Sequence, residues 1–319
     1  MTISMAICAL AASLLTAAGT PDIRKMTYTY KTVGALKIQA DVYRSASTEL
    51  RPVLVWIHGG ALITGSRQGV PKQLLDLAKQ EDYTLVSIDY RLGPEAKLPA
   101  IADDVSDALA WIRKEGPKLF RADGAKMVVS GGSAGGYLTL LAGTRVEPRP
   151  RALVAYWGYG DVDGDWYTKP SEWYRTRVPL VKEADARQAI GTQPIAETPP
   201  GGMEQKARGR LYHFYRQNGL WTKEVTGFDP ATDRVKLDPY CPIRSIPADY
   251  PPTLMIHGTK DDDVPYDQSA AMAKALAARK LPHELITVPD AGHGLAGGDQ
   301  KLIEAANARA AAFIREHLK

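Results

Sequence analysis

Short apolar runs alternate with stretches of helical spacing along most of this 319-residue chain. The runs lie at residues 53–57, 84–88, 127–130, 152–156, 253–256 and 284–288. Continuous apolar runs of this length are typical of strands buried on both faces of a sheet. Between them, apolar residues recur at helical intervals. The sequence therefore predicts an α/β fold, with a mainly parallel sheet flanked by helices.

Two segments depart from this rhythm. Residues 26–44 have the alternating pattern of a hairpin around Gly34. Between the runs at 152–156 and 253–256 lie about ninety residues without a clear strand–helix unit, and loops of that length usually carry function or structure of their own. Four of the six tryptophans fall in this stretch. We expect a helical cap inserted at about residues 158–250; a helical layer with no role in binding is the alternative.

The beginning of the chain has its own pattern. Residues 3–18 form an apolar run that ends in small residues, which is typical of a secretory signal peptide and too short for a confident membrane span. We therefore expect a signal peptide at residues 1–19, a folded domain at 26–319, and a secreted or periplasmic protein. No Lys or Arg precedes the run, so a docked N-terminal helix or a misassigned start, and with it a cytoplasmic protein, stays open.

Composition and spacing exclude several classes of site. The 40 basic and 36 acidic residues leave a net charge of +4 without a basic block, which gives nucleic-acid binding little support. Two cysteines, Cys8 and Cys241, exclude a fold held by several disulfides and a cysteine-rich zinc site. Residues 161–172 mimic the acidic spacing of a calcium loop, but Trp166 stands where that loop needs glycine. We expect no metal and no cofactor.

The strongest local motif follows the run at 127–130. Gly131–Gly135 reads G-x-S-x-G directly before a helical pattern, which predicts that Ser133 occupies a sharp strand-to-helix turn. The sequence His58-Gly59-Gly60-Ala61 follows the run at 53–57 in the same way. The backbone N–H groups of Gly59 or Gly60, with that of Ala134, could form an oxyanion hole. We expect His58 to support this loop and not to act as a base; a plain turn is the alternative.

Two later motifs complete a candidate triad. Asp261 follows the run at 253–256, and His293 follows the run at 284–288 within Ala291–Gly294. The order Ser133, Asp261, His293 is that of hydrolases in which each residue follows a different strand. In such a site the histidine takes the proton of the serine hydroxyl, and the carboxylate fixes its tautomer. Without such a pattern, a histidine in a glycine-rich loop is usually an exposed surface residue with no catalytic role.

Taken together, five motifs in this order resemble the α/β-hydrolase superfamily, and within it the hormone-sensitive lipase-like and feruloyl/acetyl esterase-like enzymes. The motifs are HGGA (58–61), DYRLGPEAKLPA (89–100), GGSAGGYL (131–138), HGTKDDDVP (257–265) and AGHG (291–294). The resemblance implies Asp261 as the acid, with Asp262 and Asp263 as solvated loop carboxylates. It also implies that residues 89–91 support the oxyanion loop. Three departures leave the subfamily open. The serine motif begins GGS rather than GDS, and Ala61 replaces the third glycine of HGGG. Only a short segment precedes the predicted sheet, where the hormone-sensitive lipase group carries a cap.

These observations predict a serine hydrolase that cleaves carboxylic esters through an acyl-enzyme on Ser133, with residues 26–319 as its α/β-hydrolase catalytic domain. The partner is a small-molecule ester, for which carbohydrate-linked esters are one candidate by analogy. A prolyl-oligopeptidase-type peptidase is the alternative enzyme, although no N-terminal propeller supports it. A non-catalytic, hydrolase-like binding protein is the alternative from another class.

Basic residues of the cap are expected on a solvated face rather than against an acidic substrate: Arg175, Arg177, Lys206, Arg208 and Arg210. The oligomeric state is left open.

Overall fold

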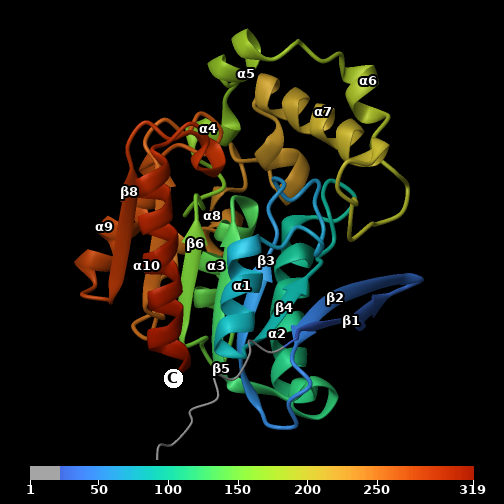
Figure 1. Ribbon diagram of the computed structural model, residues 1–319. Helices are drawn as coiled ribbons and strands as arrows, with labels where there is room; N and C mark the ends of the chain where they lie inside the picture. The colour runs from blue at the N-terminus through green and yellow to red at the C-terminus, as the bar shows by residue number, and fades with distance from the viewer. Residues whose placement is uncertain (1–21) are drawn as a thin grey trace, which may run out of the picture.

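The computed structural model describes residues 22–319 (Figure 1). The predicted signal peptide at residues 1–19, and Cys8 within it, lie outside the described residues. No helix of residues 22–319 combines the length and the apolar character needed to cross a membrane.

An eight-stranded sheet forms the centre of the molecule, in the order β1-β2-β4-β3-β5-β6-β7-β8. The strands are β1 (Arg24–Val33), β2 (Leu36–Arg44), β3 (Arg51–Ile57), β4 (Thr84–Ile88), β5 (Ala122–Gly132), β6 (Ala152–Tyr156), β7 (Thr253–Gly258) and β8 (His283–Val288). The hairpin β1–β2 is antiparallel to its neighbours, and β3 to β8 are parallel. The hairpin and all six apolar runs are therefore strands, and the predicted α/β fold class is confirmed.

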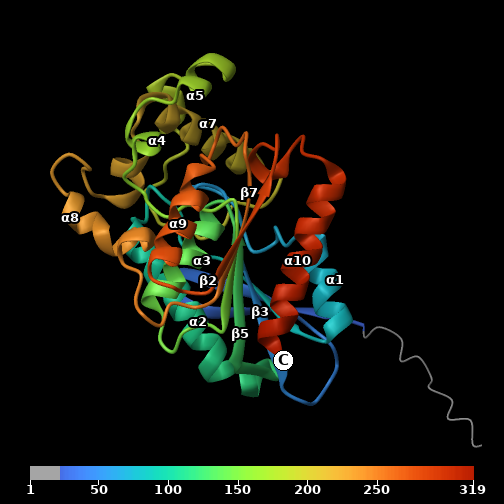
Figure 2. The same ribbon diagram turned by 90° about the vertical axis from the view of Figure 1, so that its left-hand side faces the viewer.

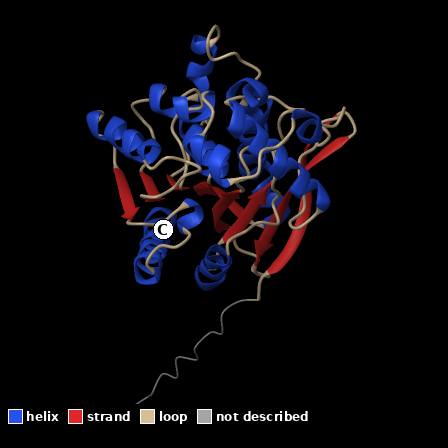
Figure 3. Cartoon of the chain, turned by 90° about the horizontal axis from the view of Figure 1, so that it is seen from above, coloured by secondary structure: helices blue, strands red, loops and turns tan. Residues whose placement is uncertain are grey.

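Helices cover both faces of this sheet (Figures 2 and 3). On one face lie α2 (Leu98–Phe120), α3 (Ala134–Arg145) and α9 (Asp267–Ala278); on the other lie α1 (Lys72–Glu81) and α10 (Gln300–Leu318). Strand β3 supplies side chains to both cores, with Val53 and Val55 on the α2–α3 side and Leu54 and Trp56 on the α1–α10 side. Burial on both faces explains why the runs lack polar alternation.

A long segment, residues 157–252, is inserted between β6 and β7 and is called the inserted segment below. It carries α4 (Asp165–Thr168), α5 (Glu172–Arg177), α6 (Glu183–Arg187), α7 (Met203–Asn218) and α8 (Arg234–Leu237). Three of these helices, α5 to α7, lie at the top of Figure 1, beyond the end of the sheet where β3 and β6 end. The division into a catalytic domain and a separate cap stays a prediction.

One basic residue of the inserted segment departs from the sequence-based expectation. Arg208 of α7 was expected on a solvated face, yet its side chain is only 1% exposed. Its guanidinium donates hydrogen bonds to the carbonyls of Ile63 (3.1 Å) and Gly93 (2.8 Å) and to the carboxylate of Glu95 (2.5 Å). The expectation is wrong because Arg208 lies on the inner face of α7 and satisfies loop carbonyls that water does not reach. It ties α7 to the loops after β3 and β4.

Candidate active site

Ser133 lies in the turn between β5 and α3, with φ 56° and ψ −122°. This region of backbone conformation is sparsely populated by residues other than glycine and persists only where surrounding structure imposes it. The surroundings leave no space at two neighbouring positions. A Cβ on Gly131 would lie 2.3 Å from the Gly135 carbonyl oxygen, and one on Gly135 would lie 2.0 Å from the Ile57 oxygen. The glycines therefore allow the turn to pack against the end of β3.

The structure brings the three predicted triad residues together. Ser133, Asp261 and His293 come from the loops after β5, β7 and β8, whose ends meet at one edge of the sheet. His293 Nε2 lies 3.1 Å from Ser133 Oγ, and His293 Nδ1 lies 2.8 Å from Asp261 Oδ2. This geometry lets an imidazole accept a proton from the serine hydroxyl while its other nitrogen donates to a carboxylate.

The carboxylate of Asp261 is fully buried and surrounded by donors. Its Oδ1 accepts hydrogen bonds from the backbone N–H groups of Asp263 (3.0 Å) and Val264 (2.9 Å), and its Oδ2 lies 3.2 Å from His257 Nε2. Burial by itself would raise the pKa of Asp261, but the hydrogen bonds from His257 and His293 outweigh it and lower the pKa well below its usual range. The group is therefore a carboxylate at neutral pH.

His293 faces two carboxylates. Besides the bond to Asp261, its Nε2 lies 3.6 Å from Oδ2 of Asp263. Burial lowers the pKa of His293, but the hydrogen bond with Asp261 and the negative charge of Asp263 outweigh burial, so the pKa is raised above its usual value. The imidazolium form is thus stabilised beside the serine hydroxyl.

Of the three predicted oxyanion-hole residues, Gly59 and Ala134 lie next to Ser133, and Gly60 follows Gly59 in the same loop. A Cβ on Gly59 would be 3.2 Å from the Ser133 Cβ and 2.8 Å from the Gly132 carbonyl oxygen, so this backbone approaches the serine directly. Gly60 has φ 110°, which a residue with a side chain rarely adopts. Ala134 is the first residue of α3, where backbone N–H groups have no partner within the helix. These positions can direct N–H groups at a developing oxyanion.

Side chains from outside the loop that carries Gly59 bind its carbonyl groups and fix its position. His58 is 3% exposed and stacks on Tyr90, with ring centres 4.3 Å apart. The Tyr90 hydroxyl donates to the His58 carbonyl at 2.9 Å, and Trp221 of the inserted segment donates to the Ala61 carbonyl at 2.9 Å. Burial lowers the pKa of His58 to about 4, so this ring is neutral. His58 has the surroundings of a loop support, as the sequence indicated.

Asp263 has a different environment from the one expected. It was expected to be a solvated loop carboxylate, but its Oδ1 accepts hydrogen bonds from the hydroxyls of Tyr174 (2.9 Å) and Tyr212 (2.5 Å) and from Arg216 Nη1 (2.7 Å). The expectation is wrong because α5 and α7 bring these donors onto the loop after β7. No local motif marks the contact; the aromatic content of the inserted segment was the only signal.

The acidic stretch at the start of the inserted segment uses its carboxylates internally. Asp161 accepts hydrogen bonds from the backbone of Gly164 and from the Trp166 indole, both at 3.0 Å. Asp163 forms a two-pronged ion pair with Arg244 at 2.9 Å for each contact. Within residues 22–319, no group of three or more His, Cys, Asp or Glu side chains is arranged to hold a metal ion.

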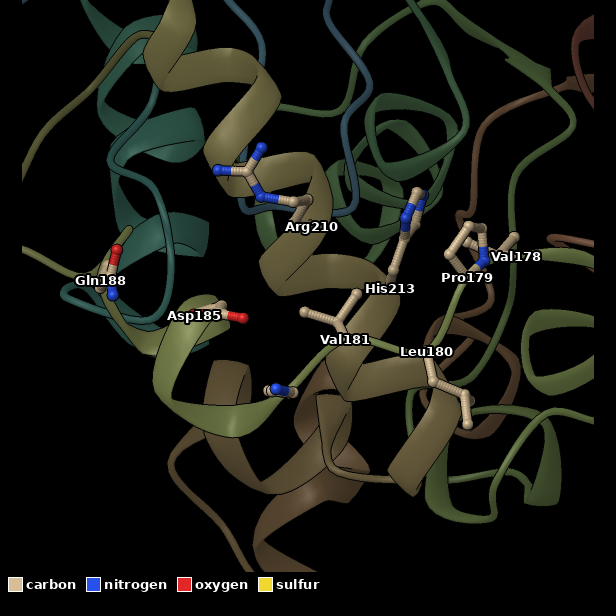
Figure 4. Close-up of a pocket in the computed structure, with 9 residues that line it drawn as sticks. Val178, Pro179, Leu180, Val181, Asp185, Gln188, Arg210 and His213 are labelled. Atoms are coloured by element: carbon tan, nitrogen blue, oxygen red, sulfur yellow. The ribbon is translucent and has the colours of Figure 1, made fainter.

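A cavity of about 470 Å³ lies within the inserted segment (Figure 4). It is lined by Val178, Pro179, Leu180, Val181, Lys182, Asp185, Gln188, Arg210 and His213. None of these is a triad residue. The His213 ring is 5.6 Å from the ring of Tyr174, which in turn binds Asp263. Through His213 and Tyr174 the cavity thus lies near Asp263, but Ser133 does not line it.

Comparison with known proteins places this geometry in a family. The family described as alpha/beta hydrolase fold matches residues 54–297, a span that contains Ser133, Asp261 and His293. Similar proteins include a non-reducing polyketide synthase of Emericella nidulans, 28% identical over 316 residues. That match covers 85% of this chain but 13% of the synthase, so the chain spans a small part of the curated relatives it matches.

Solved structures share the fold over most of their length. A protein of unknown function from Staphylococcus aureus subsp. aureus Mu50 has a TM-score of 0.73 at 20% identity, covering 92% of this chain and 100% of that one. Carboxyl esterase 2 of Tuber melanosporum has a TM-score of 0.66 at 18% identity, covering 94% and 89%. Thermogutta terrifontis esterase 2, phosphoramylated by tabun, has a TM-score of 0.64 at 20% identity, covering 95% and 97%. From the family match over more than half of its residues, the chain belongs to the α/β hydrolase fold family.

Proposed function

We propose that the protein is a serine hydrolase that cleaves carboxylic esters through an acyl-enzyme on Ser133. The observation that carries the proposal is the continuous contact chain from Ser133 Oγ through His293 to a buried, ionised Asp261. Ser133 directly precedes α3, and the N-terminus of a helix favours negative charge. The esterase names of two structural neighbours support carboxylic esters as the substrate class.

In the proposed reaction, each of these residues has its own step. His293 Nε2 takes the proton as Ser133 Oγ attacks the ester carbonyl carbon, and Asp261 stabilises the imidazolium that forms. Backbone N–H groups of Gly59, Gly60 and Ala134 donate to the carbonyl oxygen as it becomes negative. The ester C–O bond then breaks, and Nε2 returns the proton to the departing alcohol. Water then attacks the acyl-enzyme while His293 Nε2 takes its proton. The bond to Ser133 Oγ breaks, Oγ regains the proton, and the acid is released.

A fluorophosphonate probe tests the nucleophile directly. We expect it to label the wild-type protein and to leave Ser133→Ala unlabelled. Absent labelling of the wild type, or unchanged labelling of Ser133→Ala, would show that the protein is not a serine hydrolase and would favour a binding role.

Substrate class is tested separately with p-nitrophenyl esters of increasing acyl length, acetylated and feruloylated sugars, and aminoacyl amides. We expect turnover of esters. Turnover of the amides alone would replace the esterase proposal with a peptidase.

A further inference from the structure

The carboxylate of Asp263 divides its two oxygens between different neighbours. Oδ1 accepts three hydrogen bonds from the inserted segment, given above for Tyr174, Tyr212 and Arg216. Oδ2 instead faces the reacting groups, 3.6 Å from His293 Nε2. The side chain keeps 21% of its surface exposed. One oxygen is thus fixed, and the other remains as an acceptor beside the candidate triad.

The orientation of this carboxylate is held by a buried arginine. Arg216 is 3% exposed and donates through Nη1 to Oδ1 and to the backbone carbonyl of Asp263. Aromatic rings surround its guanidinium at 4.8–5.6 Å: Trp166, Tyr167, Tyr174 and Tyr212. A guanidinium packed among rings keeps a single geometry. Oδ2 is therefore a preorganised acceptor.

Oδ2 lies near the atom that would protonate the leaving alcohol in the proposed reaction. In ester hydrolysis, His293 Nε2 must come within hydrogen-bond reach of the departing alcohol oxygen in order to protonate it. An acceptor 3.6 Å from the same nitrogen is within reach of a polar group carried on that alcohol. A carboxylate offers only lone pairs, so it repels a bare alkoxide and attracts an alcohol that carries its own donor close by.

We propose that Asp263 is a specificity-determining residue that selects esters of polyols, in which a hydroxyl stands on the carbon next to the ester-bearing carbon. That hydroxyl would donate to Oδ2 while the ester oxygen faces His293 Nε2. The inference rests on the proposed ester hydrolysis at Ser133. It names the alcohol side of the substrate, and it assigns a binding contact to a residue outside the triad.

Three butyrate esters test the contact on the wild-type protein without any substitution. They are propyl butyrate, 2-hydroxypropyl butyrate and 2-methoxypropyl butyrate, which share one acyl-enzyme and differ only in the leaving alcohol. We expect kcat/KM for the hydroxy ester to exceed that of the other two by about tenfold, since a hydrogen bond to a charged group is worth that much or more. Equal values for the hydroxy and methoxy esters would overturn the proposal.

Asp263→Asn tests the residue itself. The three donors on Oδ1 should hold the amide oxygen, which leaves the NH₂ group facing the alcohol, where it cannot accept a hydrogen bond. We expect the ratio of kcat/KM for the hydroxy ester to kcat/KM for propyl butyrate to fall by about tenfold at any one pH. The control is Asp262→Asn, which removes the same charge from an exposed neighbour and should leave the preference unchanged. A preserved preference in Asp263→Asn overturns the proposal.

The outcomes separate this proposal from the one on which it rests. If the wild type takes no fluorophosphonate and cleaves none of the three esters, the serine hydrolase proposal has failed. If it takes the probe and cleaves all three esters equally, ester hydrolysis stands and the role of Asp263 is refuted. If Asp263→Asn does not fold, the comparison of the three esters on the wild type still decides for or against the hydroxyl contact.

Discussion

At the scale of single residues, packing at the Ser133 turn sets which glycines are replaceable. A Cβ at position 135 would meet the Ile57 carbonyl at 2.0 Å, whereas at position 132 the nearest atom is a ring carbon of Trp56 at 3.3 Å. We expect Gly135→Ala to lower the free energy of unfolding by about 3 kcal/mol or more, as for overpacking against backbone, and Gly132→Ala by less than about 1 kcal/mol. Urea denaturation of both variants measures the difference. Equal losses would contradict the packing argument.

The contact between Asp261 and His293 predicts a large kinetic effect with little loss of fold. Asp261→Asn keeps the shape but removes the charge and favours the wrong imidazole tautomer, so we expect kcat to fall by about 10³–10⁴. Asp262→Asn, at an exposed position one residue along, should retain the wild-type rate. Ester hydrolysis under saturating substrate measures both. A loss below about tenfold for Asp261→Asn would remove Asp261 from the proposed triad.

The surroundings of His293 predict the direction of a pH shift. Burial lowers the pKa of His293, and Arg216 lowers it further, but Asp261 and Asp263 outweigh both, so the pKa is raised above its usual value. A raised pKa keeps the imidazole protonated, and so unable to act as a base, up to a higher pH. In Asp263→Asn one negative charge is lost, and we expect the acid limb of kcat/KM to move to lower pH. The pH profile of propyl butyrate hydrolysis measures this shift; an unmoved limb would show that Asp263 does not act on His293.

At the scale of elements, the sequence predicted what local patterns encode. The strands and the turn at Ser133 follow from apolar runs and glycine spacing, and the structure has them where expected. The orientation of α7 does not follow from such patterns. Arg208 is buried and Arg210 exposed on the same helix, and only contacts with distant loops separate them. Asp263 was misassigned for the same reason, because its partners lie 47 to 89 residues away.

Two arginines of α7, Arg208 and Arg210, test how strongly the contacts between this helix and the loops after β3 and β4 stabilise the fold. Arg208→Ala leaves the Glu95 carboxylate, 4% exposed, without its guanidinium partner. We expect the free energy of unfolding to fall by about 3–5 kcal/mol, which is the cost of an uncompensated buried charge. Arg210→Ala, two residues along on the exposed side, should change it by less than about 0.5 kcal/mol. Chemical denaturation checks both; similar losses would mean that Arg208 does not anchor the helix.

At the scale of the whole molecule, the candidate site depends on two kinds of structure. The parallel strands carry the triad loops and are buried on both faces, so their relative positions are fixed by two cores. The inserted segment adds the support of Ala61 through Trp221 and the contact with Asp263 through Arg216. A sequence can reveal the first through periodicity, but the second depends on how a segment of low periodicity folds back over the sheet.

Within the inserted segment, local stability should differ sharply between α7 and the chain before it. The stretch at residues 178–202 is largely exposed, with Leu180 71% exposed, whereas α7 buries Leu211, Tyr215 and Arg216. Amide hydrogen exchange reports the free energy of local opening, which follows buried contacts. We expect 178–202 to exchange first and α7 to exchange nearly as slowly as β3 and β5. If α7 exchanged as fast as 178–202, the whole inserted segment would open as one unit, and the Asp263 acceptor would not be preorganised.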